Sequence, residues 1–310
     1  MGEYTQMDRR SFLGKTAAVA AASAVWTKAP VSGATPETKK SGDEGSAPPA
    51  WRIGCWTRPW AKYDYRVAMD AIAEAGFRYI SFTGAKTKTR RVIAPGTTLE
   101  ESQRAGEEAR RRGLTLTYVY GGGLPLHKGP ADLRKMIDNC AAAKGEYVVI
   151  SRIGAAEHLD HNCRVIAGSC DYAAEKKVGL VLKPHGGLNA TGALCRRAIE
   201  KVGHDNFTLL YDPGNVRYYS DGKIDPLEDV AATGGFVTGM SVKDYKHPKE
   251  VGLTPGTGEI DFPALMRRLK ENGFTHGPLV IECLTSRGSA KETIQEAVKA
   301  RRFVESLVGV

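Results

Sequence analysis

Charged side chains follow directly after four apolar runs in the second half of the chain. Burying such groups at the end of apolar segments is costly unless they pair with each other, with a metal or with a ligand. Several of them in equivalent positions therefore indicate one polar site. The residues that could carry chemistry in this site are Lys183, His185, Asp212, Lys243 and Glu282.

The spacing of these residues suggests which side chains share a face. Side chains alternate along a strand, so Lys183 and His185 should point the same way, as should Ser241 and Lys243. Two simpler interpretations stay open. Asp212 precedes Pro-Gly and would also suit a turn, and the two lysines could merely neutralise the acids in a structural ion network.

The elements that must position these residues alternate along the chain. Short β-prone runs are followed by helical patterns of period 3.6, several of which end at a glycine, and this is typical of parallel βαβ units. The expected strands are 53–57, 79–83, 114–120, 147–150, 178–182, 207–211, 237–242 and 279–283. The expected helices are 65–74, 99–112, 131–143, 163–176 and 291–307.

Eight such units over residues 52–310 predict a single (β/α)8 TIM barrel. An open Rossmann sheet is the main rival, but no GxGxxG follows the first strand. In a TIM barrel the reactive groups lie at the carboxyl ends of the strands. The candidate substrate-binding residues near those ends are Trp56, Arg58, Tyr120 and Asn215. Arg58, Lys246 and His247 could hold a phosphate or a carboxylate.

The N-terminus has the pattern of an export signal. Arg9-Arg10 precede Ser-Phe-Leu-Gly-Lys and a weakly apolar run that is too short to span a bilayer. This resembles a twin-arginine signal. We expect a signal region at 1–34, a flexible linker at 35–51, export to the periplasm or beyond through the twin-arginine machinery, and no stable membrane span.

The composition is that of an ordinary globular protein. Of the 310 residues, 42% are hydrophobic and 25% are charged, which argues against disorder and against a membrane protein. The formal charge is +9, yet the basic residues are scattered over expected helix faces, so we expect no nucleic-acid partner. The six cysteines contain no CxxC pair, which gives no sign of a zinc knuckle.

Four runs then give a specific resemblance. They are Tyr-Asp-Pro-Gly-Asn at 211–215, Val-Lys-Asp at 242–244, Gly-Thr-Gly-Glu-Ile-Asp-Phe at 256–262 and Gly-Pro-Leu-Val-Ile-Glu at 277–282. They resemble the sugar phosphate isomerase/epimerase family, which belongs to the xylose isomerase-like TIM-barrel superfamily. The similarity covers roughly residues 52 to 308.

The resemblance implies a divalent metal (Mn²⁺, Mg²⁺, Co²⁺ or Zn²⁺) held at the ends of strands five to eight. Asp212 and Glu282 match two of the family's ligand positions, but Lys183 and Ser241 occupy the other two. A charged ammonium cannot be a ligand and a serine hydroxyl is a poor one. His185 could replace one of the missing ligands, which gives Asp212, His185 and Glu282 as the candidate metal set.

The resulting functional hypothesis is proton transfer next to a carbonyl of a sugar or sugar derivative, catalysed by an isomerase or epimerase. The catalytic candidates are Lys183, His185, Lys243 and Glu282. We expect metal assistance, with Lys183 or Lys243 moving the proton. One alternative is a lyase or hydrolase of keto-sugars or glycosides that uses lysine in place of the metal. Another is a sugar-binding barrel without catalysis.

Overall fold

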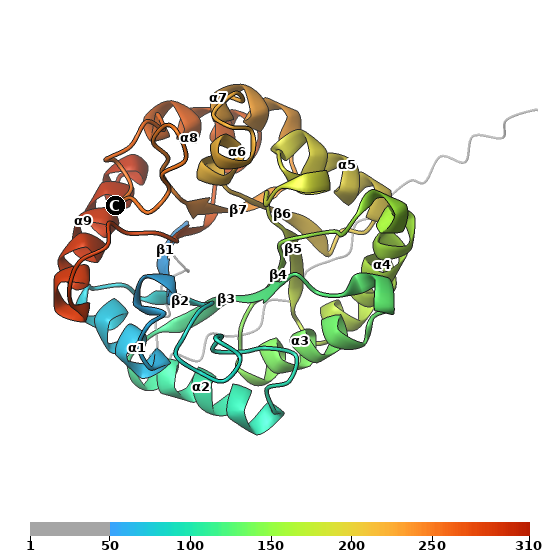
Figure 1. Ribbon diagram of the computed structural model, residues 1–310, viewed down its shortest axis with the longest axis horizontal. Helices are drawn as coiled ribbons and strands as arrows, with labels where there is room; N and C mark the ends of the chain where they lie inside the picture. Colours follow the sequence, from blue (N-terminus) through green and yellow to red (C-terminus); the bar gives the residue numbers. More distant parts are fainter. Residues whose placement is uncertain (1–49) are drawn as a thin grey trace, which may run out of the picture. The chain divides into compact units, whose positions relative to one another are not determined.

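The computed structural model describes residues 50–310 as a closed ring of eight parallel strands surrounded by helices (Figure 1). The strands follow one another around the ring in chain order, and β1 closes the barrel by pairing with β8. This confirms the predicted TIM barrel. The predicted signal region at 1–34 and the linker up to residue 49 lie outside the described residues.

The strands are short and their bounds agree with the predicted runs to within two residues. They are β1 Trp51–Trp56, β2 Tyr79–Phe82, β3 Thr115–Gly122, β4 Tyr147–Ile150, β5 Gly179–Leu182, β6 Phe207–Tyr211, β7 Val237–Val242 and β8 Gly277–Ile281.

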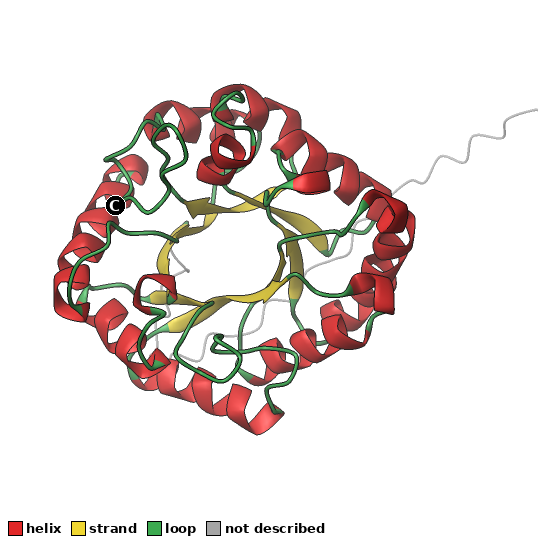
Figure 2. Ribbon diagram, in the orientation of Figure 1, coloured by secondary structure: helices red, strands yellow, loops and turns green. Residues whose placement is uncertain are grey.

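Helices cover the outside of the strand ring (Figure 2). They are α1 Tyr65–Glu74, α2 Leu99–Arg111, α3 Ala131–Ala142, α4 Leu159–Glu175, α5 Gly192–Val202, α6 Pro213–Tyr219, α7 Pro226–Asp229, α8 Phe262–Glu271 and α9 Ala290–Val308. Short 3-10 turns such as Arg58–Trp60 complete the connections. No helix within residues 50–310 is long and apolar enough to cross a membrane.

Helix starts follow ordinary capping chemistry. Thr98 and Ser289 form capping boxes at α2 and α9, in which each side chain and the glutamate three residues later satisfy free backbone N–H groups. Such caps fix where each helix begins. They therefore also fix the lengths of the loops that precede these helices at the carboxyl end of the barrel.

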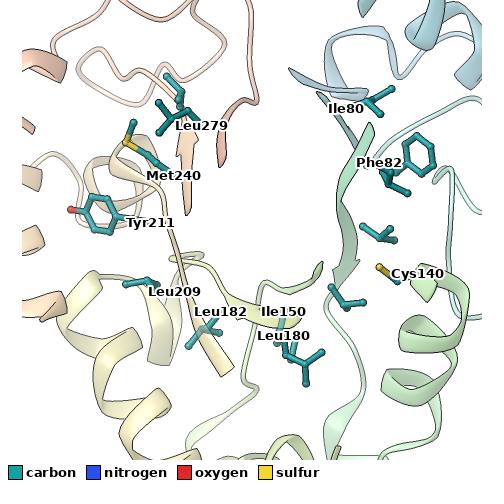
Figure 3. Close-up of a cluster of buried hydrophobic side chains, with 14 of the residues drawn as sticks. Ile80, Phe82, Cys140, Ile150, Leu180, Leu182, Leu209, Tyr211, Met240 and Leu279 are labelled. Carbon is teal, nitrogen blue, oxygen red and sulfur yellow. The ribbon is translucent and has the colours of Figure 1, made fainter. Parts of the chain in front are cut away.

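The buried hydrophobic residues form two clusters, one on each face of the strands. The larger layer packs strands against helices, and Figure 3 shows part of it, including Leu182, Leu209 and Tyr211. A smaller cluster contains Val181 and Leu210 and is separate from that layer. Because neighbouring residues of one strand belong to different layers, the strands alternate between an outer and an inner face.

Candidate functional site

Four charged residues stand directly after the last residues of four consecutive strands, β5 to β8. We call them the charge cluster: Lys183, Asp212, Lys243 and Glu282. Their charges alternate in sign from one strand to the next. All four are buried, with at most 6% of each residue exposed. This convergence is what the sequence pattern predicted.

Strand alternation explains why these residues point to one place. Val181 lies in the inner cluster of the barrel, and Lys183 comes two residues later. The same relation links Leu210 with Asp212. Side chains two residues apart on a strand share a face. The inner face of the barrel thus changes from apolar to charged at its carboxyl end.

Each ammonium group of the charge cluster contacts both carboxylates. Lys183 Nζ lies 2.9 Å from Asp212 Oδ2 and also forms an ion pair with Glu282 Oε2. Lys243 Nζ lies 2.8 Å from Glu282 Oε1 and 3.3 Å from Asp212 Oδ2. The two lysines and the two acids therefore form one closed network in which no charge is left alone.

Three further side chains complete the network. Arg58 donates from Nη1 to Glu282 Oε1 at 2.6 Å, and Ser241 donates its hydroxyl to Glu282 Oε2 at 2.7 Å. Asn215 accepts from Lys243 Nζ at 3.0 Å and donates to the Pro184 carbonyl at 2.7 Å. Its own backbone N–H donates to Asp212 Oδ1 at 2.8 Å, because Asp212 caps helix α6.

The electrostatics of the network favour the charged forms of Glu282 and Lys243. Burial alone would raise the pKa of Glu282, but Lys183, Lys243 and Arg58 hold it well below its usual value. Burial would lower the pKa of Lys243, but Asp212 and Glu282 raise it above its ordinary value. With Arg58 included, three cations face two carboxylates, so this part of the site carries an excess positive charge.

A cavity of about 290 Å³ opens above the charge cluster. Its lining comes from the carboxyl ends of strands and the loops that follow them, where TIM barrels place their active sites. The lining residues are Trp56, Arg58, Thr83, Gly84, Arg90, Arg91, Tyr120, Lys183, His185 and Glu282. Lys183 and Glu282 thus border the cavity, whereas Asp212 and Lys243 do not line it and pair with these two residues. The volume is near the lower end of the range for small-molecule sites.

His185 lines the same cavity in a defined orientation. Its Nδ1 lies 3.1 Å from the hydroxyl of Tyr219, and the two rings pack with their centroids 5.2 Å apart. Burial, followed by the positive charges of Lys183 and Lys243, lowers the pKa of His185 to about 4. The imidazole is therefore neutral at neutral pH.

The remaining predicted residues differ in whether they line the cavity. Trp56, Arg58 and Tyr120 line the cavity. Asn215 is predicted to bind substrate, but it is buried, does not line the cavity and accepts a hydrogen bond from Lys243. Lys246 and His247, considered for anion binding, are exposed and do not line the cavity.

Two arginines of this cavity were not predicted. Arg90 and Arg91 come from the loop between β2 and α2 and line the cavity together with Thr83 and Gly84. The available signal was their position after a strand of a predicted barrel, where loops build the active site. The residue pattern of the loop itself gave no indication of which side chains would turn inward.

The contacts of Asp212, His185 and Glu282 do not fit the metal site that the sequence predicts for them. Ammonium groups of Lys183 and Lys243 contact both carboxylates, and Nδ1 of His185 faces Tyr219 instead of an acid. Over residues 50–310, the structure contains no group of three or more His, Cys, Asp or Glu side chains placed to hold a metal ion. A bound cation would have to displace both lysines from the acids, because each lysine contacts both of them.

Comparison with protein families identifies the chain. A family model described as xylose isomerase-like TIM barrel matches residues 69–306. The chain belongs to the xylose isomerase-like TIM barrel family. A search of curated proteins finds no match.

Solved structures of this barrel type are similar in fold but distant in sequence. An L-ribulose 3-epimerase aligns with a TM-score of 0.65 and 18% identity, over 83% of this chain and 94% of the other. A D-allulose 3-epimerase from Methylomonas sp. also gives 0.65 and 18%, over 84% and 99%. A xylose isomerase domain protein from Planctomyces limnophilus gives 0.62 and 20%, over 84% and 97%. At these identities the likeness shows the shared barrel fold.

Proposed function

We propose that this family member is an enzyme that moves a proton on a carbon next to a carbonyl group of a sugar or sugar derivative, as an isomerase or epimerase does. One observation carries the proposal: a buried ammonium, Lys183, and a buried carboxylate, Glu282, together border a cavity of about 290 Å³ at the carboxyl end of the barrel. The fold shared with sugar epimerases agrees with it.

The ammonium of Lys183 supplies the stabilisation that this reaction needs. When a base removes the proton from carbon, the electron pair of the C–H bond forms a C=C bond, and the π pair of the C=O bond moves to the oxygen, which gives an enediolate. A fixed positive charge aimed at that oxygen lowers the barrier most effectively in a site with little water. Asp212 and Glu282 hold the ammonium in place, so little reorganisation is needed during the step.

His185 is the proposed proton acceptor. A neutral imidazole can take the proton, and the contact with Tyr219 fixes the direction of its ring. Burial, followed by the charges of the two lysines, disfavours imidazolium in the free site. Negative charge that develops on the substrate oxygen offsets their effect, so His185 becomes more basic as the enediolate forms. Protonation of the same carbon on its opposite face gives epimerisation. Protonation of the former carbonyl carbon, with transfer of the hydroxyl proton between the two oxygens, gives isomerisation.

The lysines favour lysine-based over metal-assisted chemistry. Both ammonium groups lie within ion-pair distance of both carboxylates, where a shared cation would otherwise neutralise them. The same enediolate could expel a leaving group from the next carbon, so a lyase reaction on keto-sugars differs only in its second step. Product analysis separates these outcomes.

Deuterium exchange tests the proposal across many candidate sugars at once. Purified chain is incubated in D₂O with a panel of aldoses, ketoses and keto-sugar derivatives, and solvent deuterium at the carbon next to the carbonyl is followed by NMR. We expect exchange with at least one sugar, resistance to chelator treatment, and at least a hundredfold slower exchange in Lys183→Met.

Lys201→Met is the matched control, because Lys201 pairs with Asp160 on the surface and is remote from the cavity. Far-ultraviolet circular dichroism checks that both variants are folded. Sugar binding without any exchange would instead support the non-catalytic binder. Loss of exchange on chelation and its return with Mn²⁺ would contradict the role of Lys183.

We further propose that the chain is exported through the twin-arginine machinery, on the basis of Arg9-Arg10 and the apolar run after them. In a bacterial host, replacement of both arginines by lysine should retain the chain in the cytoplasm. Lys28→Gln is a control in the same region but outside the quoted motif. Unchanged periplasmic recovery of the double-lysine variant would refute this route.

A further inference from the structure

Two arginine residues line the cavity without a counter-ion. Arg90 and Arg91 form no ion pair with any residue in the described part of the chain, residues 50–310. The acidic residue of the cavity lining is Glu282, and its oxygens are already engaged by Arg58, Lys183 and Lys243. The cavity therefore holds positive charge that its own wall does not neutralise.

The guanidinium of Arg91 is held in place by neutral groups. Its Nη1 donates to the Gly121 carbonyl at 2.8 Å, and the group lies over the ring of Tyr120 at 5.2 Å from the centroid. The Thr87 hydroxyl accepts from the Arg91 backbone N–H at 3.0 Å and donates to its carbonyl at 2.7 Å. The orientation of the cation is thus set before any ligand arrives, and its charge remains available.

A glycine makes room for this arrangement. Gly122 has φ +69°, and a Cβ built there would lie 2.1 Å from Nη2 of Arg91. A side chain at position 122 would therefore exclude the guanidinium from its present place, quite apart from the backbone strain.

Arg90 also has an unusual backbone. Its φ is 57°, in the left-handed region that favours glycine, at the end of a turn in which its N–H donates to the Thr87 carbonyl at 3.0 Å. A long side chain in such a position costs free energy locally. Arg90 is exposed to solvent and lines the cavity together with Arg91.

We infer that the substrate carries an oxyanion, a carboxylate or a phosphate, and that Arg90 and Arg91 bind it in the cavity that Lys183 and Glu282 border. A guanidinium can donate two parallel hydrogen bonds to such a group, which gives both affinity and orientation. That this ligand is a substrate rests on the proposed function; the anion site itself rests only on the cavity and its charges. The preferred ligand is therefore an acidic sugar derivative rather than the neutral parent sugar.

Calorimetric binding of matched sugars to the purified chain tests this inference. The probes are the neutral hexose, the hexuronate and the hexose 6-phosphate, each in gluco, galacto and manno configuration. We expect at least one anionic probe to bind ten times more tightly than its neutral parent, with an affinity that falls as salt is added. Comparison of the carboxylate and phosphate arms identifies which anion the site takes.

Arginine variants locate the site. Arg90→Gln and Arg91→Gln should each weaken binding of the anionic probe about tenfold to a hundredfold, which is the usual effect of losing a charged hydrogen bond. Lys88→Gln is the control for charge on the same loop, and Arg134→Gln, whose guanidinium lies over Tyr172, is the control for a cation on an aromatic ring. Both controls should bind like the unmodified chain. Arg91→Lys should be intermediate.

Failure of this inference can be told apart from failure of the proposed function. Equal binding of neutral and anionic probes, or unchanged anion binding in both glutamine variants, would overturn the anion site even if deuterium exchange occurs. Anion binding that depends on Arg90 and Arg91 in a chain that exchanges no proton would keep the anion site and refute the enzyme.

Discussion

Replacing Glu282 by glutamine should strongly destabilise the fold. The substitution preserves shape and an oxygen for Ser241, but it leaves Lys183, Lys243 and Arg58 with Asp212 as the remaining carboxylate of the network. Breaking a buried ion pair by removing one partner costs about 3–5 kcal/mol. We expect Glu282→Gln to lower the free energy of unfolding by that amount, because the residue is only 6% exposed.

A double-mutant cycle shows whether the network causes this loss. Lys183→Met alone removes one of three cations and leaves Lys243 and Arg58 with the two carboxylates, a balanced set, so its cost should lie at the lower end of the range. Combined with Glu282→Gln, the two costs should fall short of additivity by about 1–3 kcal/mol.

The assay is urea unfolding followed by tryptophan fluorescence and circular dichroism, with the m-value checked in each variant. Asp70→Asn is the control, because Asp70 pairs with Arg112 on the surface and such pairs contribute little. A loss below about 1 kcal/mol for Glu282→Gln, or additive costs in the cycle, would refute the reasoning that the buried charges depend on one another.

Three further predictions concern other parts of the site. His185 has a pKa of about 4 in the folded chain, against an ordinary value of 6.5. Because the unfolded chain takes up this proton first, the free energy of unfolding should fall as the pH drops from 6.5 to 4. Urea unfolding at several pH values should show that this free energy depends less steeply on pH in His185→Asn. Asp244→Asn should cost about 2–3 kcal/mol, since Oδ2 accepts from the N–H groups of Gly256 at 2.9 Å and Gly258 at 2.8 Å, and hydrogen exchange at these two amides should accelerate. Unchanged exchange there would contradict the anchoring role of Asp244. Gly122→Ala should displace the guanidinium of Arg91, which a crystal structure would reveal, and should reduce anion affinity as much as Arg91→Gln does.

The strands were predictable because their physics is local. Runs 147–150, 207–211 and 237–242 are predicted with the bounds that β4, β6 and β7 have, since a buried parallel strand reads as a short apolar run before a polar residue. Helix α8 was not predicted, although Asp261 caps it and a proline lies in its first turn. In the sequence, the start of α8 is marked only by the end of the family motif at 256–262.

The site was predictable only where strand geometry fixes it. Lys183 and Glu282 were predicted because side chains that point inward from the carboxyl ends of the strands must converge in a closed barrel. Arg90 and Arg91 were missed because their direction depends on a hairpin closed by Thr87, in a loop without periodicity. The amide side chain of Asn215 could bind a ligand, but it bonds to Lys243 and to a backbone carbonyl. The sequence could not reveal these partners.

The alternation of sign along β5 to β8 restricts how this protein can be re-engineered. Since each lysine touches both acids and each acid touches both lysines, any one exchange alters the charge balance at two neighbours at once. A descendant that binds a divalent ion would need both lysines replaced, because either ammonium left behind would still occupy both carboxylates. Directed evolution toward metal dependence should therefore succeed only from libraries that vary positions 183 and 243 together.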